Sequence, residues 1–237
     1  MKPEMLAQAY ADILGGATPR ADLDYETVER DIKKPNDLEV TLITDLSGSM
    51  RGEKAAEQTK TAVLIMEALA EFEDELKRER AERAVDLRVS TELRGFGSDE
   101  FELKALSDTL PFKARIAAMR AMHNPNGSAT NDFLSLGAVL KQVDEEKKKK
   151  MGEDAMRKLV ILVTDGESSN ESAAKRAKDA LAASGVIAKA LQIGSVTEEE
   201  WNMFHRVWGN DGAHLGQISE LPTRVEELLK DFLNKVF

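Results

Sequence analysis

Three oxygen-bearing side chains stand at alternate positions just after an apolar run. Residues 42–44 are Leu, Ile and Thr, and Asp45, Ser47 and Ser49 follow them. A loop that stays extended before it turns into a helix can point all three side chains the same way, because alternate residues of an extended chain share a face. Carboxylate and hydroxyl oxygens suit Mg²⁺, Mn²⁺ or Ca²⁺ and suit soft metals poorly. The spacing therefore indicates a cation-binding loop.

Two later segments carry donors of the same kind. Thr130 lies in a loop rich in Asn, Gly and Ser, directly before a helical pattern, and Asp165 follows the apolar run of residues 159–164. Neighbouring strands of a sheet lie roughly 4.8 Å apart. Asp45 and Asp165 can therefore address one small cation if their strands are neighbours.

The elements that must position these residues alternate between strands and helices. Strand patterns fall at residues 38–44, 85–97, 101–106, 159–164, 186–193 and 213–218. Helical patterns fall at residues 53–83, 111–122, 133–150, 173–181, 197–208 and 221–236. The alternation predicts an α/β fold with a doubly wound, mostly parallel six-stranded sheet, one antiparallel edge strand at 101–106, and helices on both faces. In such sheets ligands bind at the carboxyl ends of the strands.

Two finer patterns predict which side chains are buried. Residues 85–93 alternate between apolar and polar side chains, which predicts a strand with one wetter face. In the helix at 111–122, the spacing predicts four core residues, Phe112, Ile116, Met119 and Met122.

Residues 1–36 are expected to form an N-terminal extension, and residues 37–237 the domain itself.

The pattern Asp-x-Ser-x-Ser after an apolar strand, followed by a loop threonine and a second strand-end aspartate, resembles the metal-ion-dependent adhesion site of von Willebrand factor A domains. The resemblance covers the chain from about Asp37 onward and implies a Rossmann-like fold. It makes Ser47, Ser49 and Thr130 hydroxyl ligands, direct or through water. It gives Asp45 and Asp165, on neighbouring strands, the role of holding ligand waters or binding directly. The implied metal is Mg²⁺ or Mn²⁺, ahead of Ca²⁺.

Within that family, the run Asp45 to Gly52, with Gly95-Phe96 later, is similar to the intracellular bacterial branch, which includes the domain of cobaltochelatase subunits. That resemblance implies a cytoplasmic protein-binding module in which an Asp or Glu of a partner protein completes the coordination of the metal. It also implies that the module acts in the assembly or regulation of a complex with an AAA+ ATPase. This sequence has no Walker A motif, so the ATPase would be another chain.

Composition argues against several other classes of protein. A formal net charge of −10 disfavours a general nucleic-acid binder, which needs a concentrated basic surface. The absence of cysteine removes disulfides and thiolate metal sites and favours a reducing compartment. No apolar run approaches the length of a membrane span, so membrane insertion is not expected. If the chain is an excised fragment, the alternative is that it comes from an extracellular adhesin.

An enzyme is the rival from a different class. Asp45 could serve as nucleophile or base of a metal-dependent hydrolase or phosphotransferase on the same fold. Against it, the sequence has no readable second acid or base and no Gly-x-Ser-x-Gly elbow. The three histidines, His123, His205 and His214, share no ligand spacing, so a zinc site is not expected. We therefore expect a binding protein and not an enzyme.

Overall fold

The computed structural model describes residues 37–83, 88–125, 127–149, 157–166 and 168–236. The N-terminal extension predicted at 1–36 lies outside the described residues. None of the helices among the described residues is long and apolar enough to cross a membrane.

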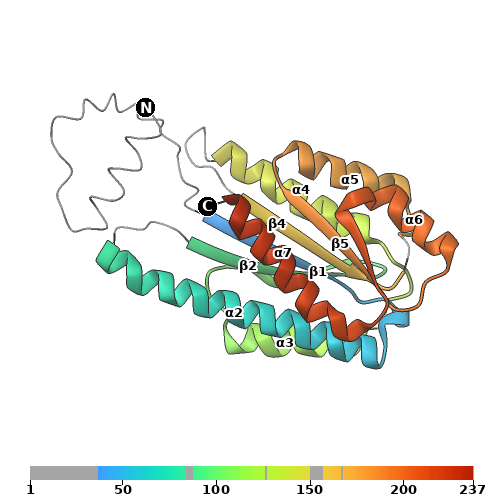
Figure 1. The fold of residues 1–237 in the computed structure, drawn as a ribbon, viewed down its shortest axis with the longest axis horizontal. Coiled ribbons are helices and arrows are strands. Elements are labelled where there is room, and N and C mark those ends of the chain that lie inside the picture. The colour runs from blue at the N-terminus through green and yellow to red at the C-terminus, as the bar shows by residue number, and fades with distance from the viewer. Residues whose placement is uncertain (1–36, 84–87, 126, 150–156, 167, 237) are drawn as a thin grey trace, which may run out of the picture. The chain divides into compact units, whose positions relative to one another are not determined.

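Six strands form one sheet (Figure 1). They are β1 (Asp37–Asp45), β2 (Arg88–Phe96), β3 (Glu100–Ser107), β4 (Arg157–Thr164), β5 (Ile187–Ile193) and β6 (Gly212–Leu215). Their order is β3-β2-β1-β4-β5-β6, and every neighbouring pair is parallel except β2 and β3. The prediction of a mostly parallel sheet with an antiparallel strand at one edge is confirmed.

The strand β1 lies at the centre of this sheet and pairs with β2 on one side and β4 on the other. Its register sets Thr44 opposite Val163 of β4, so both strands end at the same edge. Asp45 is the last residue of β1, and Asp165 directly follows β4. The order of the strands therefore brings the two aspartates to adjacent positions at the carboxyl edge.

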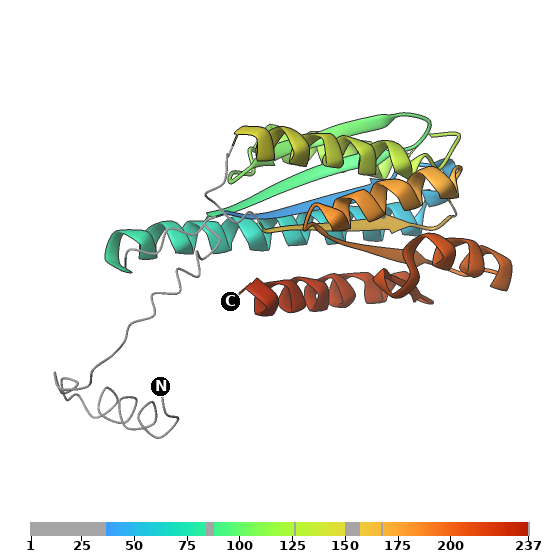
Figure 2. The ribbon, with the colours of Figure 1, turned by 90° about the horizontal axis from the view of Figure 1, so that it is seen from above.

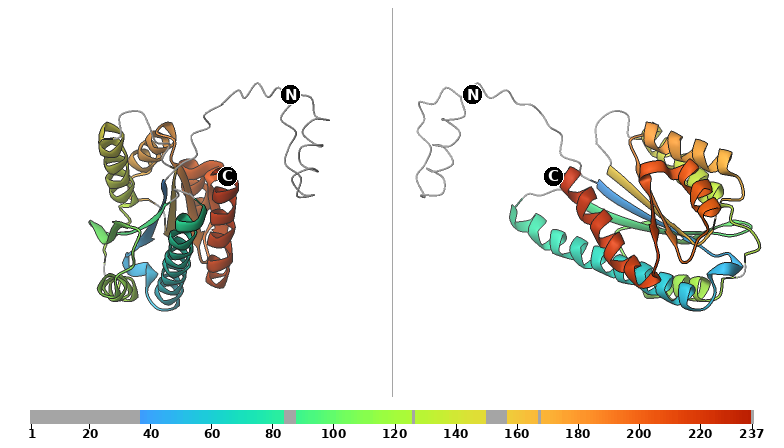
Figure 3. Two further views of the ribbon diagram at one scale, coloured as in Figure 1. Left: turned by 90° about the vertical axis from the view of Figure 1, so that its left-hand side faces the viewer. Right: turned by 45° about the vertical axis from the view of Figure 1, so that its right-hand side comes forward.

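The helices form two layers, one on each face of the sheet (Figures 2 and 3). They are α2 (Glu53–Arg83), α3 (Phe112–His123), α4 (Asp132–Lys149), α5 (Glu171–Ala183), α6 (Glu198–Trp208) and α7 (Leu221–Val236). Apolar side chains of α2, α3 and α7 share one core cluster with the sheet. Those of α4, α5 and α6 share a second cluster on the opposite face.

Local sequence signals set both ends of α6. Before α6, Thr197 and Glu200 form a reciprocal capping box: the Thr197 hydroxyl accepts from the Glu200 N–H at 3.2 Å, and the Glu200 carboxylate accepts from the Thr197 N–H at 2.6 Å. After α6, Gly209 has a φ of 53°, a conformation that glycine adopts without steric cost. Both ends of this helix follow from the sequence alone.

The predicted burial of α3 is wrong at two positions. Phe112 is 71% exposed and Met119 is 37% exposed, whereas Met122 is fully buried. The helix α3 packs mainly against α2 and β3, at the side of the fold and not over the middle of the sheet. Because only a narrow stripe of α3 is covered, two of the four predicted core residues face outward.

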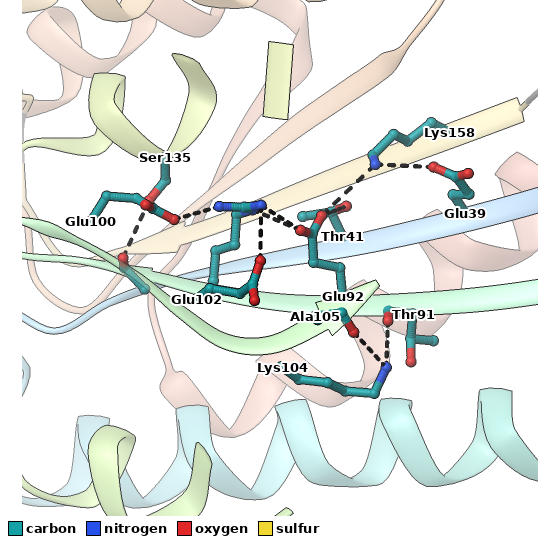
Figure 4. Close-up of polar contacts among 12 residues, drawn as sticks. Glu39, Thr41, Thr91, Glu92, Glu100, Glu102, Lys104, Ala105, Ser135 and Lys158 are labelled. Atoms are coloured by element: carbon teal, nitrogen blue, oxygen red, sulfur yellow. Dashed lines mark hydrogen bonds and ion pairs between the residues drawn. The ribbon is translucent and has the colours of Figure 1, made fainter. Parts of the chain in front are cut away.

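The predicted wetter face of β2 is found only at the start of the strand, where Arg88 is exposed and Ser90 half-buried, and the prediction is wrong at Glu92. Glu92 is completely buried, where its carboxylate accepts from the Thr41 hydroxyl at 2.8 Å and pairs with Arg94 at 2.7 Å (Figure 4). Lys158 of β4 lies 3.8 Å from Glu92 and 3.0 Å from Glu39. Buried charges of this kind persist because each is paired and hydrogen-bonded.

Candidate metal centre

Asp45 occupies the centre of the candidate site and is fully buried. One of its carboxylate oxygens, Oδ1, accepts from the backbone N–H of Ser47 at 2.7 Å. The other, Oδ2, accepts from the hydroxyl of Thr164, the last residue of β4, at 2.6 Å. These two hydrogen bonds hold the carboxylate in one orientation, and the loop and the neighbouring strand each contribute one of them.

Burial away from water raises the pKa of Asp45 to about 6. Hydrogen bonds from Ser47 and Thr164 oppose this rise, and the negative charge of Asp165 adds to it. At pH 7 the carboxylate is therefore mostly ionised but held in an environment that disfavours its charge. A cation bound beside it would relieve that cost.

Three further predicted residues form a continuous chain of hydrogen bonds with the site. The hydroxyls of Ser47 and Ser49 lie 2.9 Å apart, and the Ser49 hydroxyl donates to Asp165 Oδ1 at 2.8 Å. Gly48, Ser49 and Met50 form one turn of 3₁₀ helix, which turns the loop toward α2. Ser47, Ser49 and Asp165 are thus brought together, as the sequence predicts.

Thr130 is placed by close backbone contacts between loops. Gly127 donates its N–H to Leu46 O and accepts from the Gly48 N–H, both at 2.9 Å. A Cβ on Gly127 would lie 2.8 Å from Gly97 Cα, so only glycine allows the β2–β3 turn to approach so closely. This contact carries the segment that contains Thr130 to the carboxyl edge of the sheet.

The hydroxyl of Thr130 reaches the neighbourhood of Asp165. Thr130 Oγ1 lies 3.6 Å from the point where a Cβ on Gly166 would stand. Its backbone is fixed by Ser169, whose N–H donates to Thr130 O at 2.9 Å and whose hydroxyl accepts from the Thr130 N–H at 3.1 Å. All five predicted residues therefore lie at one edge of the sheet, on three different segments of the chain.

Asp132 belongs to the same region and was not predicted. It is the first residue of α4 and is buried, and its carboxylate accepts from the Ser168 hydroxyl at 2.5 Å and from the Phe133 N–H at 2.8 Å. Burial raises its pKa to about 6, hydrogen bonds from Ser168 and Phe133 oppose the rise, and the charge of Asp45 adds to it. An aspartate in the first turn of a helix is ordinary, so the sequence carries no signal for this role.

Lys54 also enters the site without a signal in the sequence. It is the second residue of α2, and its Nζ lies 2.5 Å from Asp165 Oδ2. A lysine in an exposed helix position normally indicates only a solvated surface. Here the start of the helix brings the ammonium group to the strand-end carboxylate.

The donors suit a hard divalent cation. Carboxylates and neutral hydroxyls are the oxygen ligands that Mg²⁺ and Mn²⁺ accept. Within the described part of the chain, no three His, Cys, Asp or Glu side chains gather as a metal site. A metal here would therefore depend on the hydroxyls of Ser47, Ser49 and Thr130 together with the aspartates.

Comparisons with known proteins agree with this reading of the fold. A family model described as the von Willebrand factor type A domain matches residues 39–212. A protein of Treponema pallidum (strain Nichols), described as uncharacterized, is 30% identical over 213 residues, which cover 86% of this chain and 35% of that protein. The chain thus spans about a third of the length of this curated relative.

Solved structures share the fold at low sequence identity. The PilB minor pilin from Streptococcus sanguinis superposes with a TM-score of 0.59 at 15% identity, over 87% of this chain and 63% of that one. A von Willebrand factor type A protein from Catenulispora acidiphila superposes with a TM-score of 0.57 at 18% identity, over 81% of this chain and 41% of that one.

Proximal thread matrix protein 1 of the mussel byssus, in a structure with a zinc-occupied MIDAS motif, gives a TM-score of 0.54 at 17% identity, over 81% of this chain and 46% of that one. At these identities the likeness concerns the fold alone. The family model, however, matches most of the sequence. The chain belongs to the von Willebrand factor type A domain family.

Proposed function

We propose that this domain is a metal-dependent protein-binding module. A divalent cation, Mg²⁺ or Mn²⁺, would be held by Asp45, Ser47, Ser49, Thr130 and Asp165, and an Asp or Glu of a partner protein would complete its coordination. Domains of this family typically act as metal-dependent protein-interaction modules. The observation that carries the proposal is the hydrogen-bonded chain from Ser47 through Ser49 to Asp165, beside the buried Asp45.

The proposed role of each group in the site follows from its chemistry. Hydroxyl ligands are neutral, so they hold an ion without cancelling its charge. The bound ion would supply a Lewis-acidic position that attracts a carboxylate. Thr164 and the Ser47 N–H fix the orientation of Asp45, and the contact of Gly127 with Leu46 and Gly48 fixes the loop that carries Thr130.

Calorimetric titration with Mg²⁺ and with Mn²⁺ tests the metal site directly. We expect saturable binding by the wild type, and loss of that binding in Ser49→Ala and in Asp165→Asn. Asp144→Asn is the matched control, because it removes one negative charge from an exposed position on α4. Equal metal binding by Asp165→Asn and by the control would contradict the assignment of the site.

An enzymatic role fits the geometry less well. Both oxygens of Asp45 accept hydrogen bonds and the residue is fully buried, whereas a nucleophile must reach its substrate. A turnover screen with general phosphatase and esterase substrates in the presence of Mg²⁺ separates the two classes. Metal-dependent hydrolysis that disappears in Asp45→Ala would overturn the binding-module proposal.

The proposed partner and location rest on the sequence alone. The similarity to the cobaltochelatase-type branch supports a complex with an AAA+ ATPase, and the cysteine-free composition supports the cytoplasm. The test is whether an AAA+ ATPase encoded beside this gene forms a complex with this chain that both EDTA and Asp165→Asn disrupt. A complex that survives both treatments would show that its interface does not use the metal.

A further inference from the structure

Lys54 is a charged residue that the proposed metal site does not use. Its ammonium group lies 2.5 Å from Asp165 Oδ2, and the Asp165 side chain is only 2% exposed. The other oxygen of that carboxylate, Oδ1, accepts from the Ser49 hydroxyl. Lys54 and the cation-binding loop therefore share one carboxylate, and each takes a different oxygen of it.

The position of Lys54 is set by the packing around it. Its backbone belongs to the first turn of α2, directly after the cation-binding loop. Its side chain passes over Gly194, where a Cβ would lie 3.3 Å from Lys54 Cε. Gly194 has a φ of 91°, so this position favours glycine on conformational grounds as well. The side chain of Lys54 is 35% exposed, which leaves it accessible from solvent.

We propose that Lys54 is a tethered cation that opposes metal binding at this site and favours the carboxylate of the partner. The inference rests on the proposed function, because it concerns the same site. The ammonium group competes with a metal ion for Asp165 and repels that ion. The same positive charge attracts a carboxylate that approaches the ion from solvent. As a result, Lys54 weakens metal binding by the domain alone, and the acidic partner recovers part of that loss.

Coulomb's law sets the size of the two effects. At a separation of about 6 Å in a medium close to water, repulsion between a single and a double charge corresponds to a roughly tenfold change in a binding constant. Attraction between two single charges under the same conditions corresponds to about threefold. Removing the charge of Lys54 should therefore tighten metal binding about tenfold and weaken carboxylate binding about threefold.

The experiment compares five proteins: wild type, Lys54→Met, Lys54→Gln, Lys54→Arg and Lys60→Met. Lys60 is the matched control, because it lies on the same helix, is 60% exposed and pairs only with Glu57 among the described residues. Lys54→Gln removes the charge but keeps a hydrogen-bond donor for Asp165, so it tests the effect of the charge if Lys54→Met does not fold. The probes are Mn²⁺ alone, by calorimetry, and acetate titrated onto the Mn²⁺-saturated protein.

We expect both neutral variants at position 54 to bind Mn²⁺ more tightly and acetate more weakly than the wild type. Lys54→Arg and Lys60→Met should behave as the wild type does. Mn²⁺ should also raise the melting temperature of the neutral variants by more than that of the wild type. Unchanged or weaker Mn²⁺ binding by both neutral variants would overturn the role of Lys54 while leaving the metal site intact. Failure of the wild type itself to bind Mn²⁺ would instead overturn the proposed function, and this inference with it.

Discussion

Replacing Asp45 with asparagine should stabilise the metal-free protein and abolish its stabilisation by metal. The substitution keeps the shape of the side chain and removes one buried negative charge. Asparagine can still accept from the Ser47 N–H through its oxygen. Its amide nitrogen would face Thr164, whose hydroxyl can turn to donate to Gly166 O, 3.3 Å away. The hydrogen bonds around position 45 are therefore kept.

The size of the effect follows from the pKa of Asp45. The folded protein raises that pKa from 3.8 to about 6, so the ionised form is disfavoured in the folded state. At pH 7 this costs about 3 kcal/mol of folding free energy, because each unit of pKa shift corresponds to about 1.4 kcal/mol. Asp45→Asn removes the cost, and imperfect hydrogen bonding reduces the gain. We expect a net gain of about 1–3 kcal/mol in EDTA.

The dependence on pH has a definite sign. Because the folded-state pKa is raised, ionisation destabilises the fold above pH 6, and protonation relieves this cost as the pH falls toward 4. The difference in stability between the mutant and the wild type in EDTA should therefore be largest at pH 7 and smaller at pH 5. Asp132 titrates in the same range in both proteins, and because the charge of Asp45 adds to the raised pKa of Asp132, relief of Asp132 contributes a smaller part of the difference.

Metal should stabilise the wild type and have almost no effect on Asp45→Asn. A ligand at a hundredfold excess over its Kd stabilises the native state by about 2.7 kcal/mol. For a domain of this size that is a rise in Tm of about 5–10 °C, at about 2–4 °C per kcal/mol. The wild type should show this rise with Mg²⁺ or Mn²⁺ at pH 7, and Asp45→Asn should show almost none.

The assay is thermal melting of the wild type, Asp45→Asn and the Asp144→Asn control, each in EDTA and in millimolar Mg²⁺ or Mn²⁺, at pH 7 and pH 5. If Asp45→Asn gains as much from metal as the wild type does, Asp45 is not in the site. If the mutant in EDTA at pH 7 is markedly less stable than the wild type, the reasoning from buried charge is wrong.

Three further changes, one of them with a matched control, test other parts of the structure. Thr130→Ala should weaken Mn²⁺ binding in calorimetry while cooperative melting persists, since Thr130 lies on a loop; loss of that cooperativity would make the residue structural. Gly127→Ala should destabilise the fold by about 1–3 kcal/mol in urea titration, because its Cβ would press on the backbone of the β2–β3 turn. Gly137→Ala, with open space at its Cβ, should not destabilise the fold, and equal effects of the two changes would refute this account. Lys158→Met should cost about 3–5 kcal/mol by the same method, because it removes the buried ion-pair partner of Glu39 and a second positive charge near Glu92; a stable variant would mean that the network tolerates the loss.

Much of this domain follows from its sequence, for reasons that act over short distances along the chain. The apolar run before Asp45 and the polar residues after it specify a strand that ends in a loop, because local hydrophobicity and turn chemistry determine both. The antiparallel edge strand β3 follows from the short turn at residues 98–100. The structure brings together Asp45, Ser47, Ser49, Thr130 and Asp165 as predicted, and their role as metal ligands remains a prediction.

Only the tertiary structure decides which polar side chains are buried and which charges meet. The alternation in β2 identifies the face of Glu92, but Glu92 itself is buried because α4 and the neighbouring strands enclose it. Phe112 is apolar yet exposed, because α3 lies to the side of the sheet. Asp132 and Lys54 reach the site because the starts of α4 and α2 converge on the carboxyl edge. Burial and pairing of charges depend on contacts between segments far apart in the chain, which no local pattern encodes.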